Sequence, residues 1–123
     1  MQHISHDGGS RDELPPELVL PCHRKLNEEG KGSHFSDVYG RMRWDSVAPT
    51  LTTGCTDVTK GRYTHPTQDR AITLREAALL QTFPSNYRFF GSMGQVARQI
   101  GNAVPVNLAK NLAAAIVKQG DRT

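Results

Sequence analysis

The chain has 123 residues, which is room for one small domain, and 37% of them are hydrophobic. A chain of this length buries about two-thirds of its unfolded surface, so a self-contained enzyme with a large cofactor pocket and a groove for a macromolecule is not expected. No run of about 18 apolar residues and no apolar leader are present, which argues against membrane insertion and secretion. The two cysteines form no disulfide framework, so the expected location is the cytoplasm.

The charge is unevenly distributed along the chain. The formal net charge is +3, yet residues 1–37 hold four basic and seven acidic side chains, a net charge of −3. Residues 38–123 hold eleven basic and five acidic side chains, a net charge of +6. A basic half of this size is compatible with a nucleic-acid partner, although many ordinary protein surfaces carry a similar excess.

The first two-thirds of the chain are predicted to contain loops and short strands. Residues 1–34 are rich in turn formers and predict a loop-rich segment with one short helix near Glu17–Leu20. Residues 35–70 contain short β-branched or weakly alternating runs that are separated by glycines and ended by Pro66. We expect these runs to form a small antiparallel sheet.

The last part of the chain is predicted to be helical because the residues that begin and end helices are clear there. Thr73 with Glu76, and Ser92 with Gln95, match the capping box that begins a helix. Gly101 is expected just past the end of the second helix, and Pro105 as the first residue of the third. The third helix carries an apolar stripe that needs a partner surface: Leu108, Leu112, Ala113, Ile116 and Val117. The predicted fold class is therefore α+β, a small antiparallel sheet followed by about three helices.

No catalytic machinery can be identified from residue types and spacing alone. Cys22 lies between Pro21 and His23, but adjacent residues rarely act together as nucleophile and base, so an inert loop cysteine is favoured. The five histidines have no ligand spacing, and no metal site is predicted. Asn102 lies between two helices, where an amide caps a loop more often than it binds a ligand at a helix N-terminus.

Basic, aromatic and hydroxyl side chains are interleaved in the strand region. Arg41, Arg43, Lys60, Arg62 and Arg70 alternate with aromatic residues and with threonines at positions 50, 52 and 53. This mixture suits contacts with phosphates and with the edges of bases. It suits an ordinary solvated sheet face equally well, so residue chemistry alone leaves both interpretations open.

Three stretches resemble DNA cytosine-5 methyltransferases. Residues 70–84, RAITLREAALLQTFP, are similar to the ninth conserved block of that family, and residues 99–105, QIGNAVP, are similar to the tenth and last block. Residues 44–53, WDSVAPTLTT, resemble the end of the target-recognition region, and residues 61–66 fit the same context. The resemblance covers residues 35–118 and makes residues 1–34 the start of the recognition region. Two long blocks in the right order and spacing make the match specific.

The resemblance implies roles for particular residues. In that family a Rossmann-like large domain binds S-adenosylmethionine and supplies a cysteine that attacks a flipped cytosine, while a smaller domain reads double-stranded DNA. The last block completes the cofactor pocket, so Asn102, Ala103 and Val104 would line the S-adenosylmethionine site once a large domain is present. The residues expected to contact DNA are Arg41, Arg43, Thr50, Leu51, Thr52, Lys60 and Arg62.

Several family features are absent from the chain. The glycine-rich cofactor block, the block with the catalytic cysteine and the acidic blocks have no counterpart, and Pro21-Cys22 lies in the wrong place to be the nucleophile. We therefore expect a C-terminal portion or subunit of a cytosine-5 methyltransferase that is not catalytic alone. It would associate with a large catalytic domain, or with itself through the last helix. The alternatives are a degenerate remnant that only binds DNA or protein, and a piece of a longer polypeptide.

Overall fold

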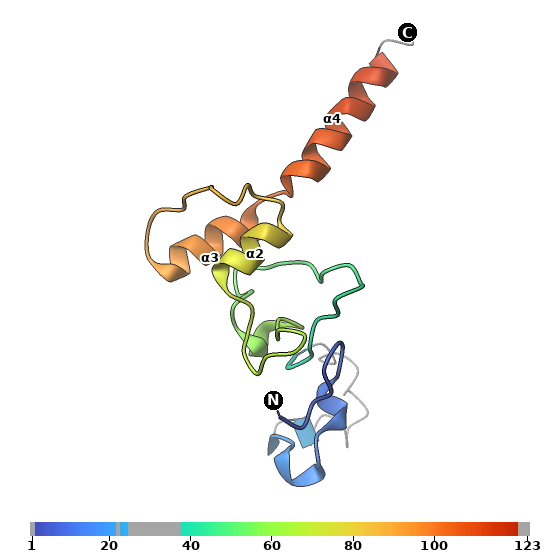
Figure 1. Ribbon diagram of the computed structural model, residues 1–123, viewed down its shortest axis with the longest axis vertical. Coiled ribbons are helices and arrows are strands. Elements are labelled where there is room, and N and C mark those ends of the chain that lie inside the picture. The colour runs from blue at the N-terminus through green and yellow to red at the C-terminus, as the bar shows by residue number, and fades with distance from the viewer. Residues whose placement is uncertain (1, 22, 25–37, 121–123) are drawn as a thin grey trace. The chain divides into compact units, whose positions relative to one another are not determined.

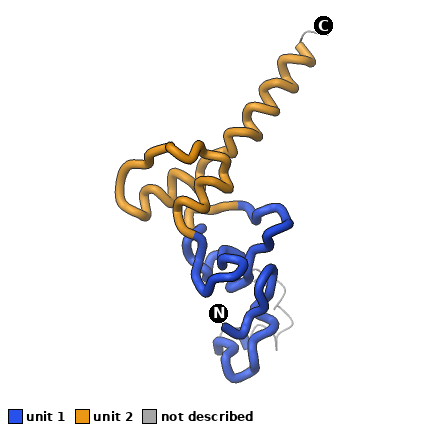
Figure 2. Tube along the Cα trace, viewed as in Figure 1, with its two compact units in different colours: residues 1–50, 55–72 blue, residues 51–54, 73–123 orange. Residues whose placement is uncertain are grey.

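The computed structural model describes residues 2–21, 23–24 and 38–120 (Figure 1). The chain divides into two compact units, which are coloured separately in Figure 2. Unit 1 comprises residues 1–50 and 55–72, and unit 2 comprises residues 51–54 and 73–123. The helices whose bounds lie within the described ranges are the 3-10 turns η1 (Arg11–Glu13), η2 (Pro16–Leu18) and η4 (Val58–Lys60) and the α-helices α2 (Leu74–Leu80), α3 (Met93–Asn102) and α4 (Val106–Gly120).

Arg41 lies at the centre of unit 1, with no exposed surface. Its Nε donates to the carbonyl of Ile4 at 3.1 Å, and its Nη1 donates to the carbonyls of His65 at 3.1 Å and Gln68 at 2.8 Å. Its Nη2 forms an ion pair with Asp69. A buried guanidinium is tolerated because these oxygens replace the water that it loses. One side chain thus joins three segments of the chain.

The predicted antiparallel sheet is wrong for the part of the chain that the structure describes. Only two isolated bridges occur there, a parallel one between Arg41 and Thr64 and an antiparallel one between Thr64 and Ala71. Beside these bridges, backbone groups bond to loops: the N–H of Arg41 donates to Gly9 at 2.9 Å. The N–H of Ile72 donates to Tyr63 at 2.8 Å as part of the single bridge between Thr64 and Ala71. Runs of two to four residues between glycines and prolines are too short for a continuous ladder.

Both predicted capping boxes are confirmed in unit 2. The Thr73 hydroxyl accepts from the N–H of Glu76, whose carboxylate accepts in return from the N–H of Thr73 at 2.7 Å. Ser92 and Gln95 make the same reciprocal pair at the start of α3. Helices α2 and α3 lie side by side (Figure 1). The side chains buried in this pair of helices are Ala77, Ala78, Ala97 and Ile100.

Helix α2 ends before Pro84, as expected, in a Schellman motif without glycine. The N–H of Phe83 donates to the carbonyl of Ala78 at 3.0 Å, and that of Thr82 donates to Leu79 at 2.9 Å. Thr82 takes the left-handed conformation with a φ of 60°, which is unusual for a β-branched residue. Its hydroxyl accepts from the N–H of Asn107 at 3.1 Å, so the turn also fixes the entry to α4.

Two predicted helix boundaries near residue 103 need correction. Gly101 lies inside α3 instead of after it, because the helix continues to Asn102 and is capped by Ala103. Pro105 precedes α4, and its carbonyl accepts the first helical hydrogen bond from Ala109 at 3.0 Å. Gly101 is required here for close packing. A Cβ at this position would overlap the backbone of Thr52 and Thr53.

Helix α4 has no buried residue. Leu108, Leu112 and Ile116 recur every fourth residue and are 50–69% exposed, so the predicted apolar stripe lies on the surface. Contrary to the sequence prediction, the segment Met93–Gly120 is long and apolar enough to cross a membrane by length and composition. The chain leaves the helical conformation at residues 103–105, so this segment is not one uninterrupted helix. It is weak support for a membrane contact.

Some predictions fall on residues outside the described ranges. Cys22 and the proposed boundary between residues 1–34 and 35–123 are among them. That division of the chain stays a prediction, and so does the cytoplasmic location.

Candidate nucleic-acid interface

Two of the predicted DNA-contacting arginines, Arg43 and Arg62, meet at Gly8 in unit 1. The Arg43 side chain lies so close to Gly8 that a Cβ there would collide with its Nε. Arg62 donates from Nη1 to the Gly8 carbonyl at 3.2 Å. Both arginines line a surface hollow together with Met42, Ser46, Val47 and Pro49. Gly8, with a φ of 101°, can adopt this backbone conformation and leave room for Arg43.

The loop that follows Arg43 is anchored at both ends. The N–H of Trp44 donates to the Asp7 carboxylate at 2.8 Å, and the Trp44 ring packs edge-on against His65 with 5.4 Å between centroids. At the other end the buried Tyr63 donates its hydroxyl proton to the carbonyl of Thr50 at 2.8 Å. Thr50 is exposed, and Val47 between the anchors is 93% exposed. The two ends of the loop are therefore held in place, and the loop between them exposes polar and apolar side chains.

Not every predicted basic residue is placed alike. Lys60 is exposed at the end of η4, which Asp57 caps by accepting from the N–H of Thr59 at 2.8 Å. The hydrogen bond from the Thr59 hydroxyl at 2.7 Å, and then the one from its N–H, lower the pKa of the Asp57 carboxyl. Arg41, in contrast, has its guanidinium bound inside unit 1. A phosphate contact by Arg41 would require breaking those internal bonds.

The predicted recognition segment belongs, from residue 51, to unit 2 together with the helices. Leu51 is 8% exposed, whereas Thr52 and Thr53 are exposed. Since the backbone of Thr52 and Thr53 lies against Gly101, this segment is in direct contact with the end of α3. The predicted recognition residue Thr52 thus lies against Gly101, which precedes the predicted cofactor residue Asn102, within one unit.

Residues 102–104 are positioned by Gln81. Its buried side-chain amide donates to the carbonyls of Ile100 at 3.1 Å and Ala103 at 3.2 Å. The N–H of Ala103 caps α3 by donating to Ile100 at 3.2 Å. Asn102 is exposed and lines a hollow, and Val104 is 62% exposed. The segment offers an amide and an apolar side chain on a fixed backbone.

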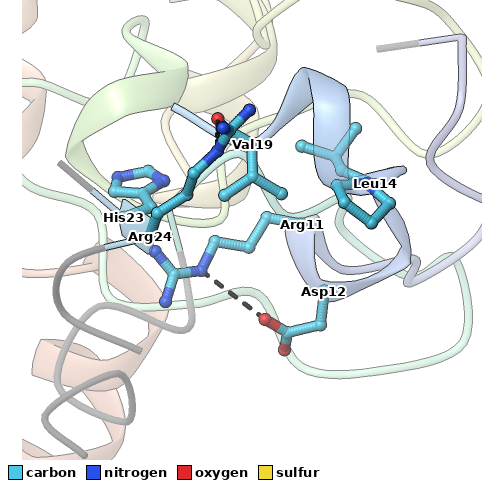
Figure 3. A pocket seen from close by; sticks show the side chains of 7 residues that line it. Arg11, Asp12, Leu14, Val19, His23 and Arg24 are labelled. Atoms are coloured by element: carbon cyan, nitrogen blue, oxygen red, sulfur yellow. Dashed lines mark hydrogen bonds and ion pairs between the residues drawn. The ribbon is translucent and has the colours of Figure 1, made fainter. Parts of the chain in front are cut away.

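A second hollow in unit 1 is lined by other residues than those predicted from sequence to bind DNA or the cofactor (Figure 3). The buried Arg11 forms an ion pair of 3.7 Å with Asp12, and His23 and Arg24 line the same hollow. Burial, and then the positive charge of Arg11, lowers the pKa of His23. Arg24 donates from Nε to the carbonyl of Val19 at 3.0 Å. Its Nη2 donates to the carbonyl of Glu17 at 3.4 Å, so the Arg24 guanidinium is directed to the protein itself.

Sequence reasoning missed the residues that hold these segments. Gln81 and Gly101 lie within the blocks that carry the family resemblance, but their roles depend on contacts across long sequence separations. The other conspicuous cysteine, Cys55, is fully buried, and burial raises the pKa of its thiol. A buried thiol with a raised pKa is a packing residue rather than a nucleophile.

Comparison with known proteins gives a consistent result. The sequence model described as C-5 cytosine-specific DNA methylase matches residues 4–118. The chain is similar to the Type II methylase M.HgiDII of Herpetosiphon aurantiacus, with 52% identity over 123 residues that cover 94% of this chain and 33% of that protein. It is 48% identical to the Type II methyltransferase M.PspPI of a Psychrobacter species, over 96% of this chain and 27% of that protein.

A similar match extends to an animal protein. DNA (cytosine-5)-methyltransferase 1 of Mus musculus is 46% identical over 79 residues, which cover 63% of this chain and 5% of that protein. The chain therefore spans at most a third of the length of these relatives.

Proposed function

Because this chain belongs to the C-5 cytosine-specific DNA methylase family, we propose that it is the recognition and closing portion of such an enzyme. It would bind double-stranded DNA and complete an S-adenosylmethionine pocket, and it would not transfer methyl groups alone. The observation that carries the proposal is the contact between the recognition segment and the cofactor segment at Gly101. Through that contact, the segment expected to recognise DNA and the segment expected to line the cofactor site support each other.

The DNA-binding part of the proposal is supported by unit 1. Arg43, Arg62 and Lys60 are basic side chains at its surface, and the loop between the Trp44 and Thr50 anchors adds exposed hydroxyl and apolar groups. Guanidinium and ammonium groups contact phosphates, while a fixed loop can present side chains to base edges. Arg41 is proposed to act by supporting this surface from inside.

The cofactor part of the proposal rests on the chemistry of residues 102–104. Members of the family use S-adenosylmethionine, which supplies the methyl group when bound. The Asn102 amide can donate to and accept from a polar ligand, and the exposed Val104 can cover an apolar part of one. These residues fit one edge of a nucleoside-sized site. The remaining walls would come from another domain.

The rest of the cofactor site would have to come from a partner domain, and α4 has a surface that could bind it. Its apolar stripe of Leu108, Leu112 and Ile116 is exposed along the whole helix. An exposed apolar surface of this kind usually marks an interface. We propose that the partner is the catalytic large domain of the same enzyme family, and that self-association through α4 is the alternative when that domain is absent.

A degenerate remnant that binds only DNA or protein is the second candidate function. It is supported by the basic surface of unit 1 and the exposed stripe of α4, because neither needs a cofactor to bind DNA or protein. The two candidates differ in one property. Only the methyltransferase portion would create a site for S-adenosylmethionine when it meets a complementary domain.

Equilibrium binding separates the two candidates. The chain is mixed with the part of the Herpetosiphon methylase that it does not cover, and the affinity for S-adenosylmethionine is measured by calorimetry. The proposal predicts binding by the mixture that weakens several-fold with Asn102→Ala. Asn107→Ala, also at an exposed asparagine, is the control and should bind like the parent chain. Duplex binding by the chain without any cofactor binding by the mixture would leave the remnant as the better explanation.

A further inference from the structure

Unit 2 carries an unusual balance of charge. Residues 73–120 contain five basic side chains and a single acidic one, Glu76. The Glu76 carboxylate is engaged in the capping box of α2, where it accepts from the N–H and the hydroxyl of Thr73 at 2.7 and 2.9 Å. Among the described residues of unit 2, Glu76 is therefore the single acidic side chain beside three arginines. None of these arginines is among the residues predicted from sequence to bind DNA.

All three arginines of residues 73–120 line hollows beside one exposed aromatic ring. Phe90 is 79% exposed and is shared by two adjoining surface hollows. One hollow is lined by Arg75 and Arg88, and the other by Arg98. The remaining lining residues that the structure describes are neutral, and they include the amides of Asn86 and Gln99. Asn102 lines the same hollow as Arg98, so this surface adjoins the segment proposed to bind the cofactor. We call Arg75, Arg88, Phe90 and Arg98 the Phe90 surface.

The loop that presents Phe90 is held in place. Arg75 donates from Nη1 to the carbonyls of Ser85 at 3.1 Å and Tyr87 at 3.3 Å, and Gln99 donates to the carbonyl of Phe90 at 2.9 Å. The chain then turns at Gly91, whose φ of 113° favours glycine.

Aromatic packing adds to the same support. The rings of Phe83, Tyr87 and Phe89 contact one another, with centroids 4.8–5.0 Å apart. These three rings pack together, whereas Phe90, next in sequence, is directed to the surface. Hydrogen bonds and ring packing hold this loop, and the loop keeps a large apolar side chain exposed. Such a side chain is suited to contact another molecule.

We propose that the Phe90 surface is a second DNA-binding site, at which Arg88 and Arg98 contact phosphates of an unpaired strand and Phe90 stacks against a base. Basic groups beside an exposed aromatic ring are the usual composition of a single-strand site, because every base has a face that can stack. An acidic protein partner would suit the arginines but would give Phe90 no specific role. The choice of DNA as the ligand rests on the proposed function, whereas the location rests on unit 2 alone.

The test is binding of the whole chain to a 20-nucleotide single strand and to the matching duplex, over a range of salt concentrations. Arg88→Gln with Arg98→Gln should lower the slope of log K against log salt by about 1 to 2, since each lost phosphate contact removes about 1. The matched control is Lys110→Gln with Lys118→Gln, which removes the same charge from α4. Phe90→Ala should weaken single-strand binding by about tenfold, and Phe90→Tyr should preserve it. Circular dichroism checks that each variant keeps its helices.

The outcomes separate this inference from the proposed function. If Arg43→Gln with Arg62→Gln weakens duplex binding while the Phe90 surface variants behave like the α4 control, the second site is refuted and the first survives. If the Phe90 surface variants bind DNA normally but no longer associate with the complementary part of a relative, the surface is a protein interface and the inference is also refuted. If the parent chain binds neither DNA at low salt, both proposals fail.

Discussion

Arg41 shows how one residue can look functional in sequence and be structural in three dimensions. It lies among the basic and aromatic residues that suggest DNA contact, yet it is fully buried and donates to the backbone carbonyls of Ile4, His65 and Gln68. Nothing in its immediate sequence distinguishes it from Arg43, which is exposed. The difference arises from partners 24 to 37 residues away, which no local pattern reports.

Replacing Arg41 should be far more damaging than replacing Arg43. Arg41→Gln leaves buried carbonyls without donors and should lower the free energy of unfolding by about 3 kcal/mol. Arg43→Gln should change it by less than about 0.5 kcal/mol because that side chain is at the surface. Urea denaturation followed by circular dichroism measures both. Equal stability of the two variants would contradict the role assigned to Arg41.

The same hydrogen-bond network makes the stability of the fold depend on pH. The hydrogen bond from Arg41 lowers the pKa of the Asp69 carboxyl, so the folded chain favours the ionised form. This stabilisation is complete above the unfolded carboxyl pKa of about 3.9 and is lost as the pH falls through the lower folded value. We expect the difference in urea midpoint between the parent chain and Asp69→Asn to shrink from pH 6 to pH 2.5. The exposed Asp45→Asn is the charge control, and a constant difference across the range would refute the link.

At the scale of elements, the parts that could be predicted are those with local signals. Capping boxes define the starts of α2 and α3 because the reciprocal hydrogen bonds involve residues three apart. The predicted sheet was wrong, since strand pairing depends on distant segments, and the described runs near Arg41 and Thr64 make only single bridges. The end of α3 was misplaced for a related reason. Gly101 looks like a helix terminator in sequence, but packing against Thr52 determines its role.

Two glycines of α3 make a matched pair for testing that packing. Gly94 has nothing within 4 Å of an added Cβ, so Gly94→Ala should stabilise the helix by about 0.5–1 kcal/mol. Gly101→Ala would drive a methyl group into the backbone of Thr52 and should destabilise the fold by about 1–3 kcal/mol. Thermal unfolding of both variants measures the two changes in stability. Stabilisation by both alanines would show that residues 52–53 do not pack on α3.

At the scale of the whole molecule, the chain is a member of its family that carries one exposed helix and part of two expected sites. Residues 102–104 and the Thr50-Leu51 pair were identified from the resemblance to known blocks, and the basic DNA-contact residues from the mixture of side chains in the strand region. The roles of all of them remain proposals. Their supports, Gln81 and Gly101, became visible only in the folded unit. The exposed stripe of α4 was expected from its spacing, since a period near four residues places apolar groups on one face.

The stripe predicts association that depends on apolar contact. Leu112→Asp should abolish binding to the complementary part of a relative, because a charge would then be buried in the interface. Asn111→Asp adds the same charge at the neighbouring exposed position and should have little effect. Analytical ultracentrifugation of the mixtures, and of each chain alone, also detects self-association. Equal association of both variants would exclude the α4 stripe as the interface.

The central claim is that these residues complete a DNA cytosine-5 methyltransferase. The most direct measurement is transfer of a labelled methyl group from S-adenosylmethionine to duplex DNA by the chain, by the uncovered part of the Herpetosiphon methylase, and by their mixture. We predict transfer by the mixture only, with a reduced rate for Asn102→Ala. Absence of transfer by an associated, DNA-bound mixture would contradict the claim.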